Sequence, residues 1–302
     1  MQKNNNLLAV SGLFFKHLKQ TESFSNNTLF AYKNDVDNFI LFARQNKIEN
    51  LDDLKEGLIL DYFKRIKSKC KGTTLGRNKS SIKKFLNYIR IDYKVNLSKP
   101  INEIKIEKQK AEYKNVSVED IEKVIEMIKG KDFFPKRDKA IFLVLYATGI
   151  RASELKNLKT KDLNLKNRFI EVKGKFNRRL LFGENIAEVI NEYLIERKRI
   201  MKIHNKTGKG YLFVERSGKG LTRQSIYLIV KKCAVNAGLN KAISPQILRN
   251  SIFIHLLSNG AREDDVKEML GNKTFIPRLE EVTERRNTDS VYISSHPILL
   301  DK

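Results

Sequence analysis

KAIFLVLYATGIRASEL, residues 139–155, is the stretch that decides how the second half of the chain folds. Its apolar part, Lys139–Ala147, predicts a helix. Thr148 and Gly149 end that helix, because glycine adopts the left-handed backbone conformation that closes a helix at little cost. Arg151–Asn157 then begins another helix, so an arginine stands directly after the turn.

The rest of the second half alternates between strands and helices. Arg168–Lys173 (RFIEVK) and Arg178–Leu181 read as two short strands joined by a turn over Gly174–Asn177. Helical periodicity returns in four further segments: Ile186–Met201, Ser225–Ala237, Ser244–Ser258 and Asp264–Leu270. The pattern predicts a mostly helical domain with a small β-hairpin.

The first half reads as helices only. Apolar residues recur at three- and four-residue spacing in residues 28–47, with Asn27 and Thr28 as candidate caps, and this pattern returns in Leu51–Ser68 and Thr74–Ile91. About four such helices form a small bundle. Pro100 breaks the pattern, and Ser117 opens a capping box before the next helix. We therefore expect a helical domain over residues 8–98, a linker over 99–115 and a second domain over 116–302.

Composition restricts the class of partner. The 302 residues hold 59 Lys and Arg against 35 Asp and Glu, a net charge of +24, while 41% hydrophobic residues are enough for real cores. Such an excess of positive charge opposes compact folding, so it indicates a polyanionic partner. No apolar run approaches the ~20 residues that cross a bilayer, and the N-terminus lacks the pattern of a signal peptide. We expect a cytoplasmic protein without membrane association.

Cysteine and histidine are too sparse for the common metal and disulfide frameworks. The chain has two Cys and four scattered His. Neither a disulfide framework nor a Cys-rich or His-rich zinc site fits those numbers. We therefore expect no metal and no cofactor.

One window of the first half is exceptionally basic. Residues 62–91 contain no acid, and a charged face of this kind either is simply solvated or contacts phosphates. The lack of any compensating acid favours phosphate contact. The residues of this window that we expect to contact DNA are Lys64, Lys71, Arg77, Lys79, Lys83 and Lys84.

Three short segments carry the chemistry: residues 148–155 (TGIRASEL), 244–249 (SPQILR) and 291–292 (VY). Taken alone, the arginine of each of the first two segments fits a surface ion pair, and the tyrosine of the third fits a packed side chain. In this order, with a lysine in the hairpin between the first two, they resemble the catalytic domain of tyrosine recombinases, the phage integrase family. The Xer-type resolvases of chromosome dimers, which serve chromosome segregation, are the most similar in pattern. The resemblance continues through residues 221–240, 243–261 and 270–272, and Arg223 in the first of these is a further expected DNA contact.

The resemblance implies a fold and a reaction. The fold is mainly α with a small β-hairpin or sheet, made of an N-terminal core-binding (SAM-like) helical bundle and a C-terminal mixed α/β catalytic domain. The activity is cutting and rejoining of duplex DNA at a recombination site through a 3′-phosphotyrosyl intermediate, by a homo-tetramer on two sites or together with a partner recombinase. The implied active site is Arg151, Lys175, Gln246, Arg249, Asn272 and Tyr292, with Glu154 supporting Arg151.

These residue types suit that chemistry. The forked guanidinium of arginine holds a phosphate in a geometry that lysine does not copy. It also stabilises the negative charge that develops on the non-bridging oxygens when the bond is cut. Tyr292 is the only tyrosine after Arg249, so it is the expected nucleophile. Lys175 matches the general acid for the 5′-oxygen, with Lys173 as the alternative two residues away.

The chain departs from the family pattern at two points. Gln246 and Asn250 stand where the family has His, and Asn272 stands where it has His or Trp. An amide at these positions donates a hydrogen bond but moves no proton at neutral pH. Asn272 and Tyr292 are 20 residues apart, whereas the family spacing is about nine. A catalytically impaired relative that binds specific DNA sites is therefore the alternative function, and a basic protein of membrane surfaces or RNA is a third.

Overall fold

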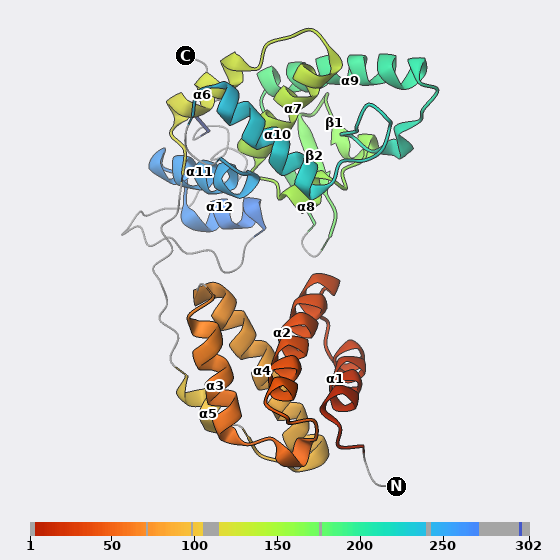
Figure 1. Ribbon diagram of the computed structural model, residues 1–302. Helices are drawn as coiled ribbons and strands as arrows, with labels where there is room; N and C mark the ends of the chain where they lie inside the picture. Colours follow the sequence, from red (N-terminus) through yellow and green to blue (C-terminus); the bar gives the residue numbers. More distant parts are fainter. Residues whose placement is uncertain are drawn as a thin grey trace. The chain divides into compact units, whose positions relative to one another are not determined.

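The computed structural model describes residues 4–70, 72–97, 99–104, 115–174, 177–239, 243–271 and 296–297 (Figure 1). The chain divides into two compact units, Met1–Ala111 and Glu112–Lys302. Each unit has its own cluster of buried hydrophobic residues. The described part of the chain holds no helix that is both long and apolar enough to cross a membrane.

Unit 1 is a bundle of helices. Helix α2 lies along α4, with α1 beside it, and α5 packs on α3 (Figure 1). Phe14, Phe39 and Phe85, from three different helices, are fully buried in its core. The helices of this unit are α1 (Leu7–Thr21), α2 (Asn26–Gln45), the 3₁₀ turn η1 (Leu51–Asp53), α3 (Glu56–Lys67), α4 (Gly72–Tyr93) and α5 (Lys99–Glu103).

The boundaries in unit 1 differ from the sequence expectation in three places. Ser25 caps α2 by accepting a hydrogen bond from the Thr28 backbone N–H at 3.2 Å, so the expected cap at Asn27 or Thr28 was wrong. The expected helix over Leu51–Ser68 is interrupted after η1. Helix α5 lies inside the segment expected as a linker, and its Ile101 belongs to the unit 1 core.

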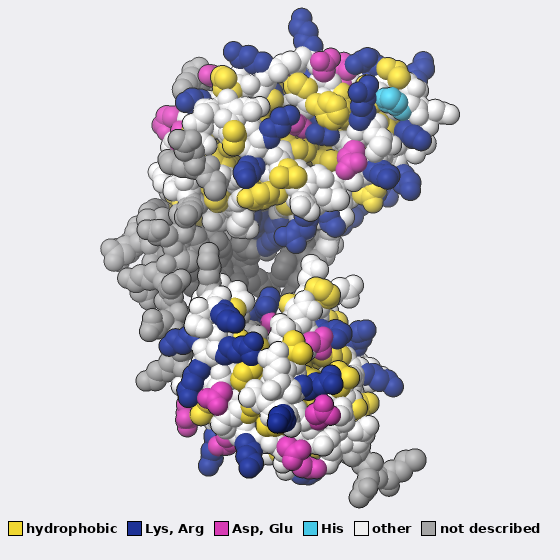
Figure 2. Space-filling model, in the orientation of Figure 1, with side chains coloured by type: hydrophobic (Ala, Val, Ile, Leu, Met, Phe, Trp, Pro, Cys, Tyr) yellow, Lys and Arg dark blue, Asp and Glu magenta, His cyan; other side chains and the backbone are white. Residues whose placement is uncertain are grey.

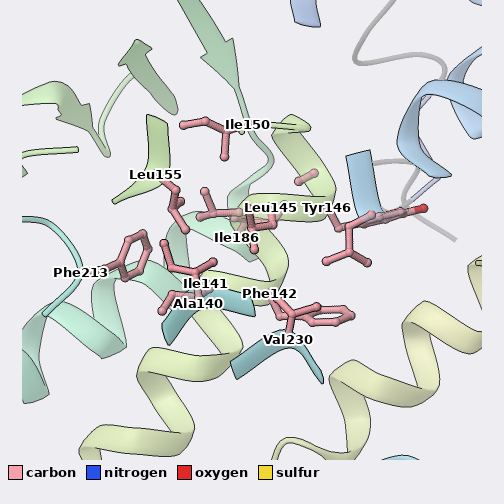
Figure 3. Close-up of a cluster of buried hydrophobic side chains, with 14 of the residues drawn as sticks. Ala140, Ile141, Phe142, Leu145, Tyr146, Ile150, Leu155, Ile186, Phe213 and Val230 are labelled. Atoms are coloured by element: carbon pink, nitrogen blue, oxygen red, sulfur yellow. The ribbon is translucent and has the colours of Figure 1, made fainter. Parts of the chain in front are cut away.

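Unit 2 surrounds one central helix. α7 (Phe133–Thr148) is buried along nearly its whole length and packs against α9, α10 and α11. Figure 3 shows Ile141, Phe142 and Leu145 of this helix among side chains from the surrounding elements, such as Val230. The other helical elements are α6 (Val118–Met127), α8 (Ala152–Leu155), η2 (Thr160–Asp162), α9 (Glu184–Ile203), η3 (Gly208–Gly210), α10 (Arg223–Asn236), α11 (Pro245–Ser258) and α12 (Glu263–Leu270).

A small antiparallel sheet lies beside these helices. It has the order β1 (Leu163–Asn164), β2 (Phe169–Val172), β3 (Arg178–Leu181), and Val172 pairs with Arg178. The two longer strands confirm the expected hairpin, whereas the two-residue β1 was not expected from the sequence. The turn of the hairpin includes Lys175, which lies outside the described residues.

The turn after α7 confirms the expectation for residues 148–155. Gly149 caps the helix in the left-handed conformation, with φ 58°. A Cβ atom at Gly149 would lie 2.4 Å from Leu270 and 3.2 Å from Ile252, so the position also requires the absence of a side chain. This close packing brings the start of α8 next to α11 and to the end of α12.

Candidate active site

Three helix starts in unit 2 border one hollow of about 540 Å³. Its walls come from the first residues of α8, α10 and α11. They are Arg151, Ala152, Ser153, Arg223, Gln224, Tyr227, Ser244, Pro245, Gln246 and Arg249. The structure thus brings together four residues that the sequence singled out, namely the three arginines and Gln246.

The starts of α10 and α11 favour negative charge in this hollow. Their caps, Thr222 and Ser244, accept hydrogen bonds from the backbone N–H groups of Ser225 at 2.9 Å and Ile247 at 3.2 Å. The remaining N–H groups of a first helical turn and the helix dipole attract anions. Both helices have 14 residues.

Arg249 is the buried arginine of the site, with 3% of its surface exposed. Its guanidinium donates to the carbonyl of Gly149 and, at 2.5 Å, to the carbonyl of Leu270. These bonds fix the fork between the turn after α7 and the end of α12. Burial, together with the nearby Arg151 and Arg178 and against the opposing effect of Glu154, lowers the pKa of Arg249 to about 9.

Arg151 is the accessible partner, with one third of its side chain exposed. It donates to Glu154 Oε1 at 3.2 Å and to the carbonyl of Gly271 at 3.1 Å. Glu154 also accepts the Arg151 backbone N–H at 2.9 Å. Burial acts to raise the pKa of Glu154, but its bonds with Arg178 and Arg151 outweigh burial and hold that pKa below its usual value. The carboxylate is therefore ionised and ties Arg151 in place.

Arg178 belongs to the same cluster and was not singled out from the sequence. Its side chain, 8% exposed, donates to both oxygens of Glu154 at 3.0 and 2.8 Å and to the carbonyl of Met269 at 2.9 Å. Strand alternation was the available signal, because it places Arg178 on the side of the buried Leu180 and Arg179 on the exposed side.

The cluster has an excess of positive charge. Among the described residues, this cluster combines three guanidinium groups, on Arg151, Arg178 and Arg249, with one carboxylate, that of Glu154. Burial is the largest cause of the lowered pKa of Arg249, and the neighbouring cations Arg151 and Arg178 add to it because each disfavours the charged form. An anion in the hollow would relieve this repulsion. The geometry is therefore that of a site for a phosphate-sized anion.

The other expected site residues have different surroundings. Gln246 donates to Asn250 Oδ1 at 2.9 Å from the edge of the hollow. Lys173 is 65% exposed and lies 3.5 Å from Asp162 Oδ1. The predictions for Lys175, Asn272 and Tyr292 fall outside the described residues.

Several basic residues of the window 62–91 in unit 1 pair with acidic residues that lie outside this window in the sequence. Arg77 pairs with the buried Asp35 of α2, and Lys84 lies 2.5 Å from Glu22. Lys79 donates to the carbonyl of Ile104 at 2.7 Å.

The other expected DNA contacts of this window differ from these. Lys83 is exposed, and Lys64 pairs with Asp61 at 3.2 Å on the surface. Lys71 lies outside the described residues.

The surface of both units is rich in basic side chains. Lys and Arg predominate over Asp and Glu on the visible face of each unit (Figure 2). Together with the cationic hollow, this defines a class: a strongly basic protein of two units, one of which holds a site for a phosphate-sized anion.

Comparison with known proteins assigns the family within that class. Residues 114–275 match the phage integrase family, and residues 12–90 match the phage integrase N-terminal SAM-like domain. The chain therefore belongs to the phage integrase family of tyrosine recombinases.

Curated relatives extend the similarity to most of the chain. It is 32% identical to tyrosine recombinase XerC of Thermodesulfovibrio yellowstonii, over 94% of this chain and 95% of the relative. It is also 32% identical to tyrosine recombinase XerD of Oceanobacillus iheyensis, over 94% of this chain and 97% of the relative. The crystal structure of XerH site-specific recombinase bound to difH substrate has the same fold, with a TM-score of 0.66, 18% identity and coverage of 99% and 96%.

Proposed function

We propose that this protein is a site-specific DNA recombinase that cuts and rejoins duplex DNA through a 3′-phosphotyrosyl intermediate. The observation that carries the proposal is the pair Arg151 and Arg249, which converge at one hollow together with the starts of α10 and α11. Membership of the tyrosine recombinase family supports the same reaction.

Arg151 and Arg249 hold the scissile phosphate in this proposal. Both guanidinium groups border the hollow, and their remaining N–H groups bond the non-bridging oxygens. Negative charge grows on these oxygens as the phosphorus becomes five-coordinate, so fixed cations stabilise the transition state more than the ground state. Glu154 keeps Arg151 in the required orientation through two hydrogen bonds.

Tyr292 is the nucleophile that we assign. Its phenolic oxygen attacks phosphorus and loses its proton to solvent or a neighbouring base, while the bond from phosphorus to the 5′-oxygen breaks. Lys175 gives a proton to that 5′-oxygen. A 5′-hydroxyl of the partner strand later attacks the phosphotyrosine and reverses the step, so the bond energy is kept.

Gln246 and Asn272 act as neutral donors to the phosphate in this scheme. An amide replaces the hydrogen bond of an imidazole but not its proton transfer, which contributes typically ~10²–10⁴-fold. The bond from Gln246 to Asn250 leaves the second N–H of the amide for a ligand. This substitution is the specific reason to retain a second candidate function, that of a DNA-binding relative with impaired cleavage.

We assign residues 8–98 together with α5 to the core-binding domain, the rest of residues 99–115 to the linker and 116–302 to the catalytic domain. Lys64, Lys71, Arg77, Lys79, Lys83, Lys84 and Arg223 are the proposed phosphate contacts along the duplex. A homo-tetramer on two sites, or a mixed tetramer with a partner recombinase, is the assembly that strand exchange requires. The reaction then takes place in the cytoplasm, where the DNA substrate is found.

Covalent trapping tests the proposal. Purified protein and its Tyr292→Phe variant are incubated with nicked genomic fragments of the source cell, denatured and separated by electrophoresis. A covalent DNA adduct in the wild type alone supports Tyr292 as the nucleophile, and sequencing of the trapped DNA identifies the site. An Arg179→Gln variant is the matched control, because Arg179 is a surface residue of the same hairpin.

Two other outcomes are informative. An adduct that persists in Tyr292→Phe contradicts the assigned nucleophile and leaves the reaction class intact. No adduct in either protein, with specific fragments still retained under native conditions, favours the impaired DNA-binding relative.

A further inference from the structure

Arg178 makes the contacts of a residue that serves the site without touching its ligand. It is the first residue of β3, and unlike Arg151 and Arg249 it is not among the residues that line the hollow. Both terminal nitrogens donate to Glu154, and Nε donates to the carbonyl of Met269. A guanidinium engaged in this way offers little to DNA, so any role in the reaction is exerted through its neighbours.

Three consecutive carbonyls at the end of α12 each accept a different arginine. Met269 accepts from Arg178 at 2.9 Å, Leu270 from Arg249 at 2.5 Å, and Gly271 from Arg151 at 3.1 Å. These are among the carbonyls that a helix end leaves unpaired, and they carry its partial negative charge. The end of α12 therefore gathers the three cations that would otherwise repel one another.

Arg178 is the member of this set that belongs to the hairpin. Glu154 bonds Arg178 and Arg151 at once, so β3 is joined to the start of α8 through one carboxylate. Gly271 also lies close, since a Cβ atom there would be 3.3 Å from the Arg178 guanidinium. The hairpin, the start of α8 and the end of α12 thus meet at this side chain.

We propose that Arg178 is a positioning residue that holds β3, the strand that follows the assigned general acid in the sequence, against the arginine pair. This rests on the proposed function, because Lys175 stands three residues before Arg178 and is the acid assigned there. A displacement of about 1 Å between reacting groups costs ~10²-fold in rate. Arg178→Lys keeps the charge but has no fork to bond Glu154 and Met269 together.

A change of leaving group separates positioning of the acid from support of the fold. The DNA site recovered by trapping is prepared as two duplexes, one with the natural 5′-oxygen at the scissile phosphate and one with a bridging 5′-sulfur. A thiolate departs without a proton, so the sulfur substrate does not need the acid. We expect Arg178→Lys to slow cleavage of the oxygen substrate ~10²-fold or more and that of the sulfur substrate only a few-fold. Because the ratio compares two substrates on one protein sample, a smaller folded fraction does not alter it.

Two controls complete the design. Arg179→Lys changes the neighbouring residue, whose side chain is 68% exposed, and leaves the rate ratio at the wild-type value. Lys175→Ala shows the ratio that full loss of the acid produces. DNA affinity of Arg178→Lys stays within a few-fold of the wild type, because its guanidinium does not contact the phosphates.

Equal slowing of both substrates overturns the proposal, since Arg178 then supports only the arginine pair or the fold. An unchanged rate on the oxygen substrate overturns it as well. Failure of the proposed function has a different signature: the wild type cleaves neither substrate, and the role of Arg178 falls with it. If Lys175→Ala leaves the ratio unchanged while Arg178→Lys raises it, the acid is another residue that Arg178 positions.

Discussion

A buried histidine of unit 2 lies four residues after the assigned nucleophile in the sequence. His296 is fully buried, donates from Nε2 to the carbonyl of Ala147 at 3.2 Å and packs against Tyr146. Burial, aided by the nearby His255 and against the opposing effect of the bond to Ala147, lowers its pKa to about 3. The folded protein therefore holds this imidazole neutral.

The lowered pKa predicts a loss of stability in mild acid. The unfolded chain takes up a proton at His296 near pH 6.5 and the folded chain does not, so protons favour unfolding as the pH falls below 6.5. Between pH 7 and pH 5 this residue removes about 2 kcal/mol of stability. Urea denaturation of the wild type and His296→Phe at both pH values measures the difference. The variant is less stable at pH 7 and loses less on acidification; equal losses would contradict the assignment.

Arg77 is a basic residue that stabilises the fold by pairing with a buried carboxylate of unit 1. It bonds both oxygens of Asp35, at 2.8 and 3.1 Å, and that carboxylate is 3% exposed. Arg77→Met leaves a buried charge without its cation and costs about 3–5 kcal/mol of unit 1 stability. Lys83→Met on the same helix, at an exposed position, stays within about 0.5 kcal/mol. Hydrogen exchange of the α2 and α4 amides measures the stability of unit 1 separately from that of unit 2. Equal protection in the two variants would refute the prediction.

These residues mark the limit of sequence reasoning at this scale. The sequence identified Arg151, Glu154, Arg249 and Gln246 as members of one site. The two arginines and Gln246 do border one hollow, and Glu154 pairs with Arg151 beside it. It did not find Arg178, because its partners Glu154 and Met269 lie 24 and 91 positions away. The window without acids in residues 62–91 was interpreted from its own residues alone, although Asp35 and Glu22 from other elements form ion pairs with it.

At the scale of elements, the turn from α7 into α8 sets the geometry of the arginine pair. Gly149 combines a left-handed backbone with direct contact to Leu270, and its carbonyl accepts from Arg249. Gly238, after α10, shares the positive φ but has no atom within 4 Å of a hypothetical Cβ. A substitution at Gly238 therefore measures the cost of the positive φ alone, and a substitution at Gly149 measures that cost together with the cost of a steric clash.

Alanine at these positions gives the corresponding prediction. Gly238→Ala costs about 1–2 kcal/mol, the price of a left-handed residue with a Cβ. Gly149→Ala adds about 1–3 kcal/mol for overpacking against Leu270 and Ile252. It also displaces the acceptor of Arg249, so DNA cleavage falls along with stability. Thermal denaturation and cleavage assays on both variants test this, and equal destabilisation would show that the contact with Leu270 relaxes freely.

The elements themselves were largely predictable. Strong periodicity placed α9 to α12 within about two residues of their observed ends, and Ser117 is a cap as expected. The short elements were missed. β1 has two residues and α5 has five, so their periodicity is too brief to detect, and packing on β2 and α3 stabilises them instead.

At the scale of the whole molecule, the net charge of +24 is the dominant property. It is distributed over both units rather than gathered in one arm (Figure 2). Part of it is offset within the protein by ion pairs, such as that of Arg178 with Glu154. The remainder lies on side chains such as Lys83, which are free to exchange water and counterions for DNA phosphates.

That distribution predicts a steep dependence of DNA binding on salt. Each phosphate neutralised by a Lys or Arg releases counterions, so the logarithm of the association constant falls by about 0.9 per contact for each tenfold rise in salt. Six or more contacts across two units lower the affinity ~10³-fold or more between 50 and 200 mM salt. Fluorescence anisotropy with the trapped site and with an unrelated duplex measures both slopes. Lys83→Gln makes both slopes shallower by about one contact, because phosphates carry no sequence information. A wild-type slope equivalent to one or two contacts would mean that the excess charge of the units serves something other than the duplex backbone.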